Sequence, residues 1–504
     1  MTHIAFQPKG PRLELDTDYV VVGSGAGGAA VAVQLARGGA TVAVVEAGPW
    51  RNPEDYPTSM YGALRDQFDN WGMSVARGKA IWPVIQARLV GGTTVINSAI
   101  VVRTPGDIFE EWKTNHGVGG EEMAKAVWEY QDQIENELHV VKVPTKSRGN
   151  SNRLAALASK RLNFKSHVIS RNVKACSGSG QCLQGCKDDK KQSTNVTYIP
   201  ETIRLGGTIL SCAPVQKVTF QGRTATGVQG HFVHPHTRAK GAKFFVRARK
   251  AVIVAASATH SPALLERSGV KSKALGKYFR AHPGSGIVGC YRDKVDMSTG
   301  ATQGWASTAF RTNPGYKLET LSLPLELVAG RISGAGTQLT QRLNEYGHMA
   351  MWIAAVRAET TGTVHNGLGN LPVVKYAMNH PDMHRLRDGA YQVAQMHFAA
   401  GAQAVIPGII GLPFKIRADQ VNLVRDAPLD PQRWTGILSH LFGGCVMGSN
   451  PETSVVNEKG KVHHYDRLYV ADAAALPTTL GVNPQHTIMG LAKYRADQLL
   501  DLAA

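Results

Sequence analysis

A buried strand, a glycine-rich turn and a helix are predicted in immediate succession near the start of the chain. The run Tyr19–Val22 is apolar and rich in β-branched residues, which suits a buried parallel strand. The turn GSGAGG follows at residues 23–28, and an Ala-, Val- and Leu-rich helical pattern then runs to about Arg37. A strand that enters a helix through such a turn predicts a dinucleotide-binding unit built on a parallel sheet.

Three glycines of this turn have separate tasks in such a unit. Gly23 permits the tight turn, Gly25 lets the backbone approach a pyrophosphate, and Gly28 lets the helix pack against the strand. The helix N-terminus then offers free N–H groups to the phosphates. A second predicted strand, residues 41–45, ends in Glu46, which is placed to accept hydrogen bonds from ribose hydroxyls. These features alone fit NAD or FAD.

A second glycine-rich stretch, RLVGGTTVIN from Arg88 to Asn97, separates these alternatives. It resembles the R-x-x-G-G-[ST]-x-x-x-N stretch that members of the glucose–methanol–choline (GMC) oxidoreductase family carry against the flavin. Two further stretches match in family order, VIVAASATHSPALLERSGV at 252–270 and YVAD at 469–472. The resemblance covers roughly residues 16–105, 195–290 and 435–502, and it implies that the dinucleotide is FAD.

The resemblance also implies which residues surround this cofactor. The expected FAD-binding residues are Gly23, Gly25, Gly28, Glu46, Arg88, Gly91, Gly92, Thr93, Asn97, Val215, Asp472, Asn483 and Pro484. Asp472 has a second interpretation, as a cap of the turn that follows it. Some family members attach FAD through a histidine just before the asparagine, where this chain has Ile96, so the FAD is expected to be non-covalent.

The expected fold is α/β, with a Rossmann-like FAD-binding domain interleaved with a substrate domain made of a sheet and helices. The length of 504 residues is too great for one core and favours two joined domains. Residues 1–105, 195–290 and 435–504 are assigned to the FAD-binding domain, and residues 106–194 and 291–434 to the substrate domain. The latter is predicted to contain a strand at 348–357 and a helix at 385–400. The apolar stretch 396–414 is interpreted as a buried segment, with a membrane-facing entrance loop as the alternative.

Two polar residues near the C-terminus are the candidate catalytic residues. Oxidising an alcohol removes a hydroxyl proton and a hydride, and a flavin takes only the hydride, at N5, so a base is required. A neutral imidazole suits this role. By resemblance, His440 in SHLFGGCVMG is that base, and Asn483 in GVNP would hydrogen-bond the substrate oxygen.

Each of these assignments has an alternative. His440 could cap a turn, and Asn483, which precedes Pro484, could simply be a turn residue. His486 is a rival base, but it falls where the family has a spacer residue, so a supporting role is expected for it.

Three of the six cysteines, Cys176, Cys182 and Cys186, lie in a glycine-rich loop at residues 176–186 with C-x5-C-x3-C spacing. The spacing resembles that of GMC dehydrogenase subunits that hold a three-iron cluster, which makes a [3Fe-4S] cluster possible. Many relatives have a fourth cysteine where this chain has Ser179, which argues against a four-cysteine site. Structural cysteines without metal, a zinc site and a disulfide remain alternatives.

The chain carries a formal net charge of +18. Residues 142–191 hold twelve Lys or Arg residues and two acids, Asp188 and Asp189. A basic face around the cysteine loop could guide an acidic electron-transfer protein, such as a cytochrome or small subunit, or an anionic membrane surface; a solvated surface is the simpler interpretation. Nucleic-acid binding is not expected, because no recognition module accompanies the charge.

The sequence therefore predicts an FAD-dependent enzyme that oxidises a bulky or hydrophobic primary or secondary alcohol, with a dehydrogenase favoured over an oxidase. The alternatives are an oxygen-using oxidase without a cluster and a non-redox lyase or decarboxylase on the same fold. The first residues lack the apolar region of a signal peptide, and no transmembrane segment is expected. A cytoplasmic enzyme is predicted, with co-export beside a partner subunit to the periplasm or membrane as the alternative.

Overall fold

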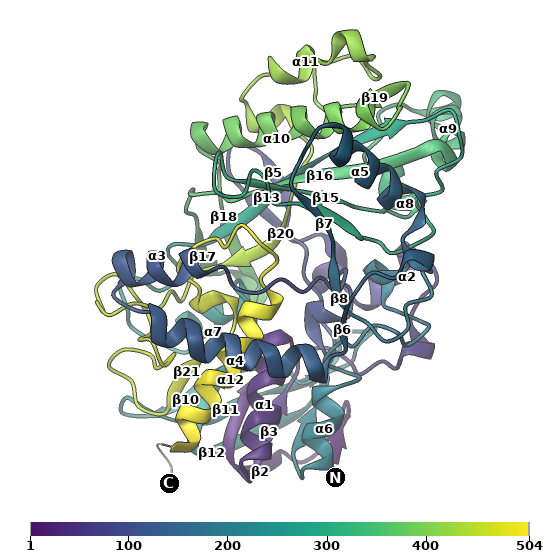
Figure 1. Ribbon diagram of the computed structural model, residues 1–504. Coiled ribbons are helices and arrows are strands. Elements are labelled where there is room, and N and C mark those ends of the chain that lie inside the picture. Colours follow the sequence, from purple (N-terminus) through teal and green to yellow (C-terminus); the bar gives the residue numbers. More distant parts are fainter. Residues whose placement is uncertain (1, 502–504) are drawn as a thin grey trace.

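The computed structural model describes residues 2–501, and a largely parallel sheet forms its lower half (Figure 1). The strands come from opposite ends of the chain. In order across the sheet they are β1 (Thr2–Ile4), β9 (Thr208–Leu210), β3 (Val42–Val45), β2 (Leu13–Val22), β12 (Lys240–Val254), β11 (Thr224–Val233) and β10 (Val215–Gln221). β21 (Leu468–Val470) pairs in parallel with the end of β12. The sheet is parallel from β1 to β12, whereas β10 and β11 are antiparallel to their neighbours.

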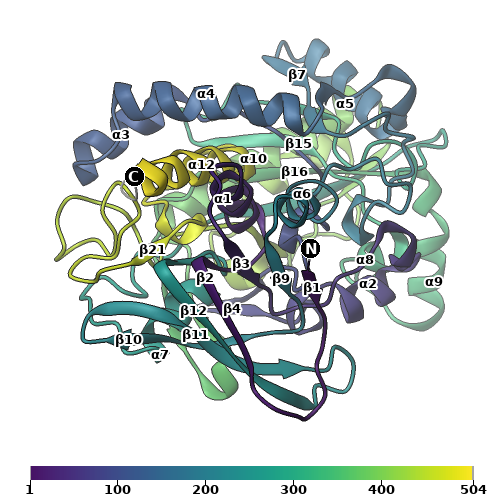
Figure 2. The same cartoon turned by 90° about the horizontal axis from the view of Figure 1, so that it is seen from below.

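The predicted strand–turn–helix unit lies at the centre of this sheet. β2 is longer than predicted, but its last part, Tyr19–Val22, is buried as expected. Helix α1 (Ala26–Arg37) follows the turn and packs against α12 (Gln485–Asp501) and α6 (Tyr198–Arg204). Figure 2 shows these three helices on one side of the strands, with α4 (Glu121–Glu137) outside them. The Rossmann-like arrangement is thus confirmed.

A second sheet, antiparallel and with seven strands, forms the upper half. Its order is β19 (Ala404–Ile406), β13 (Arg280–Cys290), β16 (Met349–Val356), β15 (Tyr316–Thr320), β14 (Trp305–Ser307) and β7 (Ser166–Val168), with β20 (Gly436–Phe442) also paired to β13. Helix α10 (His380–Ala399) packs along β16, β13 and β15, and α5 (Gly149–Arg161) packs beside α10. The strand predicted at 348–357 and the helix predicted at 385–400 correspond to β16 and α10.

Shorter elements complete the two halves. β4 (Val75–Arg77), β5 (Ile81–Pro83), β17 (Thr363–Asn366) and β18 (Pro372–Lys375) form a small sheet, and β6 (Val140–Lys142) pairs with β8 (Ser170–Asn172). The remaining α-helices are α2 (Met60–Asp66), α3 (Gly106–His116), α7 (His260–Arg267), α8 (Leu325–Ala329), α9 (Gly336–Asn344) and α11 (Asn422–Arg425).

The region 106–137, which the sequence assigns to the substrate domain, packs on the parallel sheet. Phe109 and Trp112 of α3 belong to the same apolar core as Val20 of β2, and α4 lies along α12. The exact domain boundaries stay a prediction, whereas the interleaving is visible in the strand order itself.

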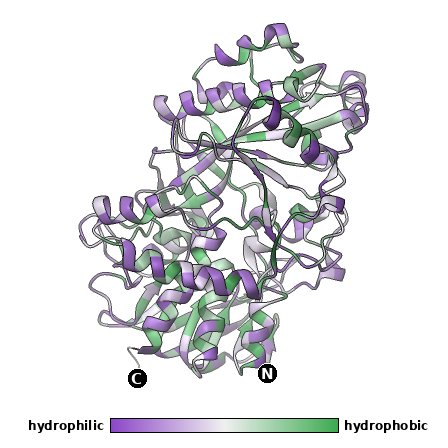
Figure 3. Ribbon diagram, in the orientation of Figure 1, coloured by the Kyte–Doolittle hydropathy of each residue, from purple (hydrophilic) through white to green (hydrophobic). Residues whose placement is uncertain are grey.

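The apolar stretch 396–414 covers the end of α10, β19 and the loop after it. Val405 and Ile409 are buried in the substrate-sheet core, while Ile410 is 58% exposed. Figure 3 shows apolar residues concentrated along the strands of both sheets. Among residues 2–501, no helix is both long and apolar enough to cross a membrane.

Candidate active site

The glycine turn is packed so closely that side chains are excluded at two of the three predicted positions. Gly23 has φ +100°, and a Cβ there would lie 2.4 Å from the carbonyl oxygen of Ala255. A Cβ at Gly28 would lie 2.1 Å from the oxygen of Gly23. Gly25 differs, because a Cβ there would meet no described atom within 4 Å. The backbone at Gly25 therefore faces open space, as a pyrophosphate-binding position requires.

The second glycine-rich stretch lies directly on this turn. Gly91 and Gly92 both have positive φ, +97° and +51°. The Gly91 N–H donates to Ser24 Oγ at 2.9 Å, and a Cβ at Gly92 would lie 2.9 Å from the Cα of Gly25. The two motifs, distant in sequence, thus form one glycine-lined surface.

Two ionisable residues flank this surface. Glu46, at the end of β3, accepts hydrogen bonds from Ser24 N at 3.0 Å, Ser24 Oγ at 2.7 Å and Gly48 N at 2.9 Å. Burial raises the pKa of Glu46 above its usual range, although these hydrogen bonds and Arg88 oppose the shift. Arg88 Nε is buried and has no hydrogen-bond partner within residues 2–501, so its N–H can donate to a bound ligand.

The other expected FAD-binding residues come from several elements of the fold. Asp472 follows β21 and accepts hydrogen bonds from Ser257 N at 2.8 Å, Ser261 Oγ and Ala474 N, so it does cap the following turn. Val215 begins β10, where its carbonyl accepts a hydrogen bond from Arg267 at 2.9 Å. Thr93 Oγ1 accepts from Ala87 N, and Pro484 precedes α12.

These residues fit an FAD. Helix α1 starts at Gly25 with no side-chain cap and no acidic residue in its first turn, as far as the described chain goes, so its N-terminus can receive phosphates. The Gly91–Gly92 turn lies against Gly25, and Arg88, whose buried Nε has no partner within residues 2–501, precedes that turn by three residues. Ile96 is buried, at 2% exposed, and its aliphatic side chain has no group that could bond to a flavin at that position.

The structure brings His440 and Asn483 together from different halves of the molecule. His440 lies on β20, and Asn483 lies in the turn before α12. His440 Nε2 and Asn483 Nδ2 are 3.3 Å apart. Burial lowers the pKa of His440 to about 4, although the residue as a whole is half-buried. The ring is therefore neutral at ordinary pH, as a base must be.

Two residues not predicted from the sequence, Lys317 and His282, contact this pair. Lys317 Nζ donates to Asn483 Oδ1 and forms an ion pair with Glu319, and both charged side chains are 4% exposed. His282, on β13, lies opposite His440 across the strands, with the two Nδ1 atoms 3.2 Å apart. Burial and the neighbouring positive groups hold the pKa of His282 well below its usual range.

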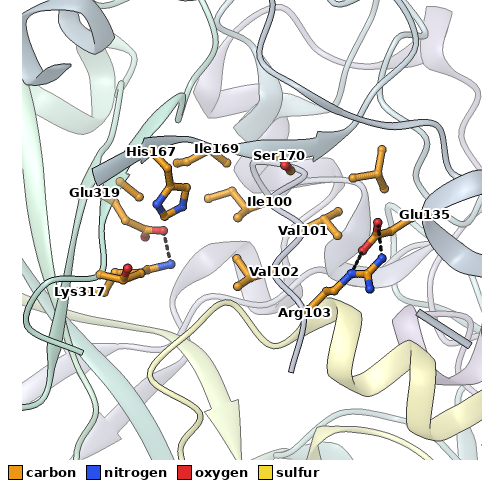
Figure 4. Close-up of a pocket in the computed structure, with 13 residues that line it drawn as sticks. Ile100, Val101, Val102, Arg103, Glu135, His167, Ile169, Ser170, Lys317 and Glu319 are labelled. Carbon is orange, nitrogen blue, oxygen red and sulfur yellow. Dashed lines mark hydrogen bonds and ion pairs between the residues drawn. The ribbon is translucent and has the colours of Figure 1, made fainter. Parts of the chain in front are cut away.

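A cavity of about 300 Å³ adjoins Lys317 (Figure 4). Ile100, Val102 and Ile169 form apolar walls, Lys317 with Glu319 lies at one end, and Arg103 with Glu135 lies at the other. The lining residues 100–103 follow Asn97 closely in sequence, and Lys317, which also lines the cavity, donates to Asn483 Oδ1. The cavity thus adjoins the His440 and Asn483 pair through Lys317, although neither of the two residues lines it.

Comparison with known proteins decides the family. Residues 17–284 match the N-terminal part of the GMC oxidoreductase family, and residues 354–492 match its C-terminal part. The chain belongs to the GMC oxidoreductase family. Membership implies an FAD cofactor and a small-molecule substrate, and relatives of this chain include alcohol oxidases.

Relatives from several organisms cover nearly the whole chain. An uncharacterized GMC-type oxidoreductase of Mycobacterium tuberculosis is 32% identical, over 95% of this chain and 75% of that protein. The long-chain-alcohol oxidase FAO1 of Arabidopsis thaliana is 26% identical, over 97% of this chain and 67% of its own length. Choline oxidase of Arthrobacter globiformis is 24% identical over 95% of this chain and 93% of that protein.

Solved structures of GMC enzymes share the fold at lower identity. Pyridoxine 4-oxidase from Mesorbium loti superposes with a TM-score of 0.70 at 16% identity, covering 96% of this chain and 99% of that one. Formate oxidase superposes with a TM-score of 0.72 at 17% identity, covering 97% and 99%.

Asn97 and His486, both singled out in the sequence, have different positions relative to the expected site. Asn97 Oδ1 accepts from Ala99 N at 2.9 Å, and its Nδ2 donates to Gln485 Oε1, so it links the second glycine stretch to α12. His486 is buried, but its Nε2 contacts Glu135 at 3.2 Å rather than the His440 pair. The structure thus gives His486 no place beside His440.

The residues around the predicted iron–sulfur cluster do not fit one. Among residues 2–501, no group of three or more His, Cys, Asp or Glu side chains is arranged to hold a metal ion. The guanidinium of buried Arg171 instead donates to Cys182 Sγ at 2.8 Å and to Cys176 Sγ at 3.7 Å, and the Lys190 N–H donates to Cys186 Sγ. The three sulfur atoms thus accept hydrogen bonds from the protein and are not arranged around a metal position.

The same loop is tied to the FAD segment. Arg171 Nε donates to the Ser98 carbonyl at 2.8 Å, and Lys191 Nζ donates to the carbonyls of Asn97 and Cys182. Burial alone would raise the pKa of Cys182, but Arg171 and Lys191 lower it to about 7. Two buried cations, Arg171 and Lys191, thus link the cysteine loop by hydrogen bonds to the backbone at Asn97 and Ser98.

Lys317 could have been suspected from a limited sequence signal, whereas His282 could not. Lys317 and Glu319 alternate with apolar residues in YKLET, which places two opposite charges on one face of a strand. His282 has no comparable signal, since its role depends on the register between β13 and β20.

Two glycine substitutions should separate packing from cofactor binding. A Cβ at Gly27 would lie 1.9 Å from the Ala471 oxygen, so Gly27→Ala should force α1 from β21 and destabilise the protein by about 1–3 kcal/mol. Gly25→Ala meets open space, so we expect a normal melting temperature but a reduced FAD content. Thermal melts and flavin absorbance of the purified variants measure both effects. Full FAD occupancy in Gly25→Ala would contradict the assignment of Gly25.

Proposed function

We propose that this protein oxidises an alcohol to the carbonyl compound at the site formed by His440 and Asn483. The proximity of His440 Nε2 and Asn483 Nδ2, at 3.3 Å, is the observation that carries the proposal. The bound flavin would supply the hydride acceptor. His440 would take the hydroxyl proton as general base, and Asn483 would orient the oxygen by donating a hydrogen bond to it.

The surroundings support a dry, positively charged site for this chemistry. Lys317 donates to the Asn483 oxygen, which turns the amide nitrogen of Asn483 toward His440. The ammonium of Lys317 also favours negative charge on a nearby oxygen, since electrostatic interactions are strong where water is excluded. Glu319 balances that charge, so the pair keeps its place in the apolar interior.

The cavity supports a substrate with an apolar body. Its walls at Ile100, Val102 and Ile169 lack polar side-chain groups, and its charged residues lie at the two ends, with the small hydroxyl of Ser170 between them. A hydrocarbon chain or ring that carries a primary or secondary hydroxyl fits this distribution. Similarity to long-chain-alcohol oxidases over 97% of this chain supports the same class.

A different observation bears on which molecule accepts the electrons from the reduced flavin. The expectation of a dehydrogenase rested on the cysteine loop, whose residues do not fit a cluster. The relatives whose names state an activity are oxidases, which supports dioxygen as the acceptor. Oxygen uptake compared with reduction of an artificial dye, under the same alcohol, distinguishes the two. A basic docking face for a redox partner belongs to the dehydrogenase alternative, whereas the cytoplasmic location stays a separate prediction.

Replacement of His440 should remove most of the alcohol-dependent activity. We expect His440→Ala to slow flavin bleaching by an alcohol by roughly 10²–10⁴-fold, the usual contribution of a general base. FAD content should be retained, because His440 lies on the substrate sheet. His486→Ala is the matched control, three residues after Asn483, and should bleach at nearly the normal rate. Normal bleaching in His440→Ala with loss in His486→Ala would reverse the assignment.

The rate of flavin reduction should depend little on pH in the ordinary range. Burial lowers the pKa of His440 to about 4, so the neutral, proton-accepting form persists until the pH approaches that value. We expect a constant rate from neutral pH down to about 5 and a decline near pH 4. Anaerobic stopped-flow absorbance measures this profile. A decline centred near the pKa of a free histidine would show that a less buried group acts as the base.

A further inference from the structure

The small sheet formed by β17, β18, β4 and β5 has one face in the protein core and the other in solvent. Its strands β17 and β18 lie at the left of Figure 1. On the inner face, Trp82, Val364 and Val374 are buried in the same apolar core as the substrate sheet. Side chains alternate along a strand, so the neighbouring residues point away from this core. The outer face thus formed exposes Arg77, Ile81, Val373 and Lys375.

Large apolar side chains gather on this outer face and on the turns at its edge. β18 and β4 run parallel, so the turns that lead into them lie at the same end of the sheet. Leu368 in one turn is 96% exposed, Met73 in the other is 73% exposed, and Ile81 on β5 is 70% exposed. The exposed apolar residues of the face and its turns are Trp71, Met73, Ile81, Leu368, Leu371 and Val373. Such a gathering marks a surface for a protein partner or a membrane.

The charged side chains on the same face are basic. Residues 70–85 and 360–379, which build the small sheet and its turns, contain no Asp or Glu. They do contain Arg77, Lys79 and Lys375, all of which are exposed. Arg77 lies directly opposite Lys375 in the pairing of β4 with β18, where two like charges repel each other. Glu266 contacts the sheet only at its far edge, through β17. The outer face therefore favours an anionic partner.

A lipid surface fits this combination better than a second copy of the chain does. In a two-fold dimer the same surface meets itself, so the three basic residues would meet equal positive charge. Anionic headgroups would instead pair with them, while the apolar side chains reach the boundary of the acyl chains. Tryptophan, present here as Trp71, is favoured at that boundary. The net charge of +18 adds attraction at long range.

We propose that the outer face of the small sheet attaches this protein to the surface of an anionic lipid bilayer. The inference goes beyond the proposed function, because it concerns where the enzyme lies rather than the reaction it performs. The face contains no residue of the basic region 142–191 and none of the apolar stretch 396–414. Apolar alcohols partition into a bilayer, so attachment would bring the enzyme to that class of substrate.

Co-sedimentation of the holoenzyme with vesicles measures the attachment. We expect binding to vesicles of equal parts phosphatidylcholine and phosphatidylglycerol, and much weaker binding to phosphatidylcholine alone. Ile81→Ser should lower the affinity roughly tenfold, because it removes an apolar contact, and Lys79→Glu roughly fivefold or more, because it reverses a charge. Both side chains are exposed, so both variants should keep the wild-type melting temperature. Absence of binding to either kind of vesicle, or unchanged affinity in either variant, would overturn the proposal.

Ile410→Ser and Lys174→Glu are the matched controls. Ile410 is an exposed isoleucine in the apolar stretch 396–414, and Lys174 is an exposed lysine in the basic region beside the cysteine loop. We expect both variants to bind vesicles like the wild type. If these two variants lose binding while Ile81→Ser and Lys79→Glu retain it, the membrane contact lies elsewhere and the proposal is wrong.

Two further measurements identify what covers the face. Brominated lipids quench a tryptophan that reaches the acyl chains, so part of the wild-type quenching should be lost in Trp71→Phe, which keeps an aromatic ring; equal quenching in both would count against the proposal. Sedimentation velocity without lipid should show the same oligomeric state for the wild type, Ile81→Ser and Lys79→Glu. A dimer that these two variants dissociate would assign the face to a second copy of the chain and refute the membrane assignment. None of these measurements requires turnover.

Discussion

Close contact between backbones, with no side chain between them, fixes the position of the FAD site. At the start of α1, residues 23–28 touch Ala255, Ala471 and the Gly91–Gly92 turn, and a single added methyl group would collide at most of these points. Such contacts leave little freedom for the helix to shift. The phosphate-binding end of α1 is therefore held by the packing of four chain segments rather than by any one hydrogen bond.

The substrate sheet is joined to this centre through the strand that carries His440. β20 pairs with β13 along its length, and directly after it the Gly443 N–H donates to the Ala473 carbonyl, which follows β21. One short segment thus belongs to the antiparallel sheet at one end and contacts the parallel sheet at the other. This continuity places His440 at the junction of the two halves, where Asn483 arrives from the turn before α12.

The sequence predicted the parts of this arrangement that depend on local patterns. The β2–α1 unit, the strand at 348–357 and the helix at 385–400 follow from apolar periodicity and glycine placement, and His440 and Asn483 from short motifs. Lys317 and His282 were missed because their roles arise from strand pairing and from contacts between distant segments. The cysteine spacing suggested a cluster because nothing local reveals that Arg171, from β8, reaches the sulfur atoms. Local sequence patterns say least about buried charged side chains that pair with an oppositely charged group from a distant segment.

The order of strands in the parallel sheet has a consequence for how the chain folds. β2 and α1 are synthesised well before their neighbours, because β9 and β12 follow residue 207 and β21 and α12 follow residue 467. The apolar face of α1 that α12 covers thus stays without its partner while about 450 residues in between are synthesised. Contacts of such long sequence separation slow folding, because the chain closes large loops before gaining stability. The segment that binds the phosphates is consequently among the last to reach its native environment, although it is made before every other strand that it contacts in the parallel sheet.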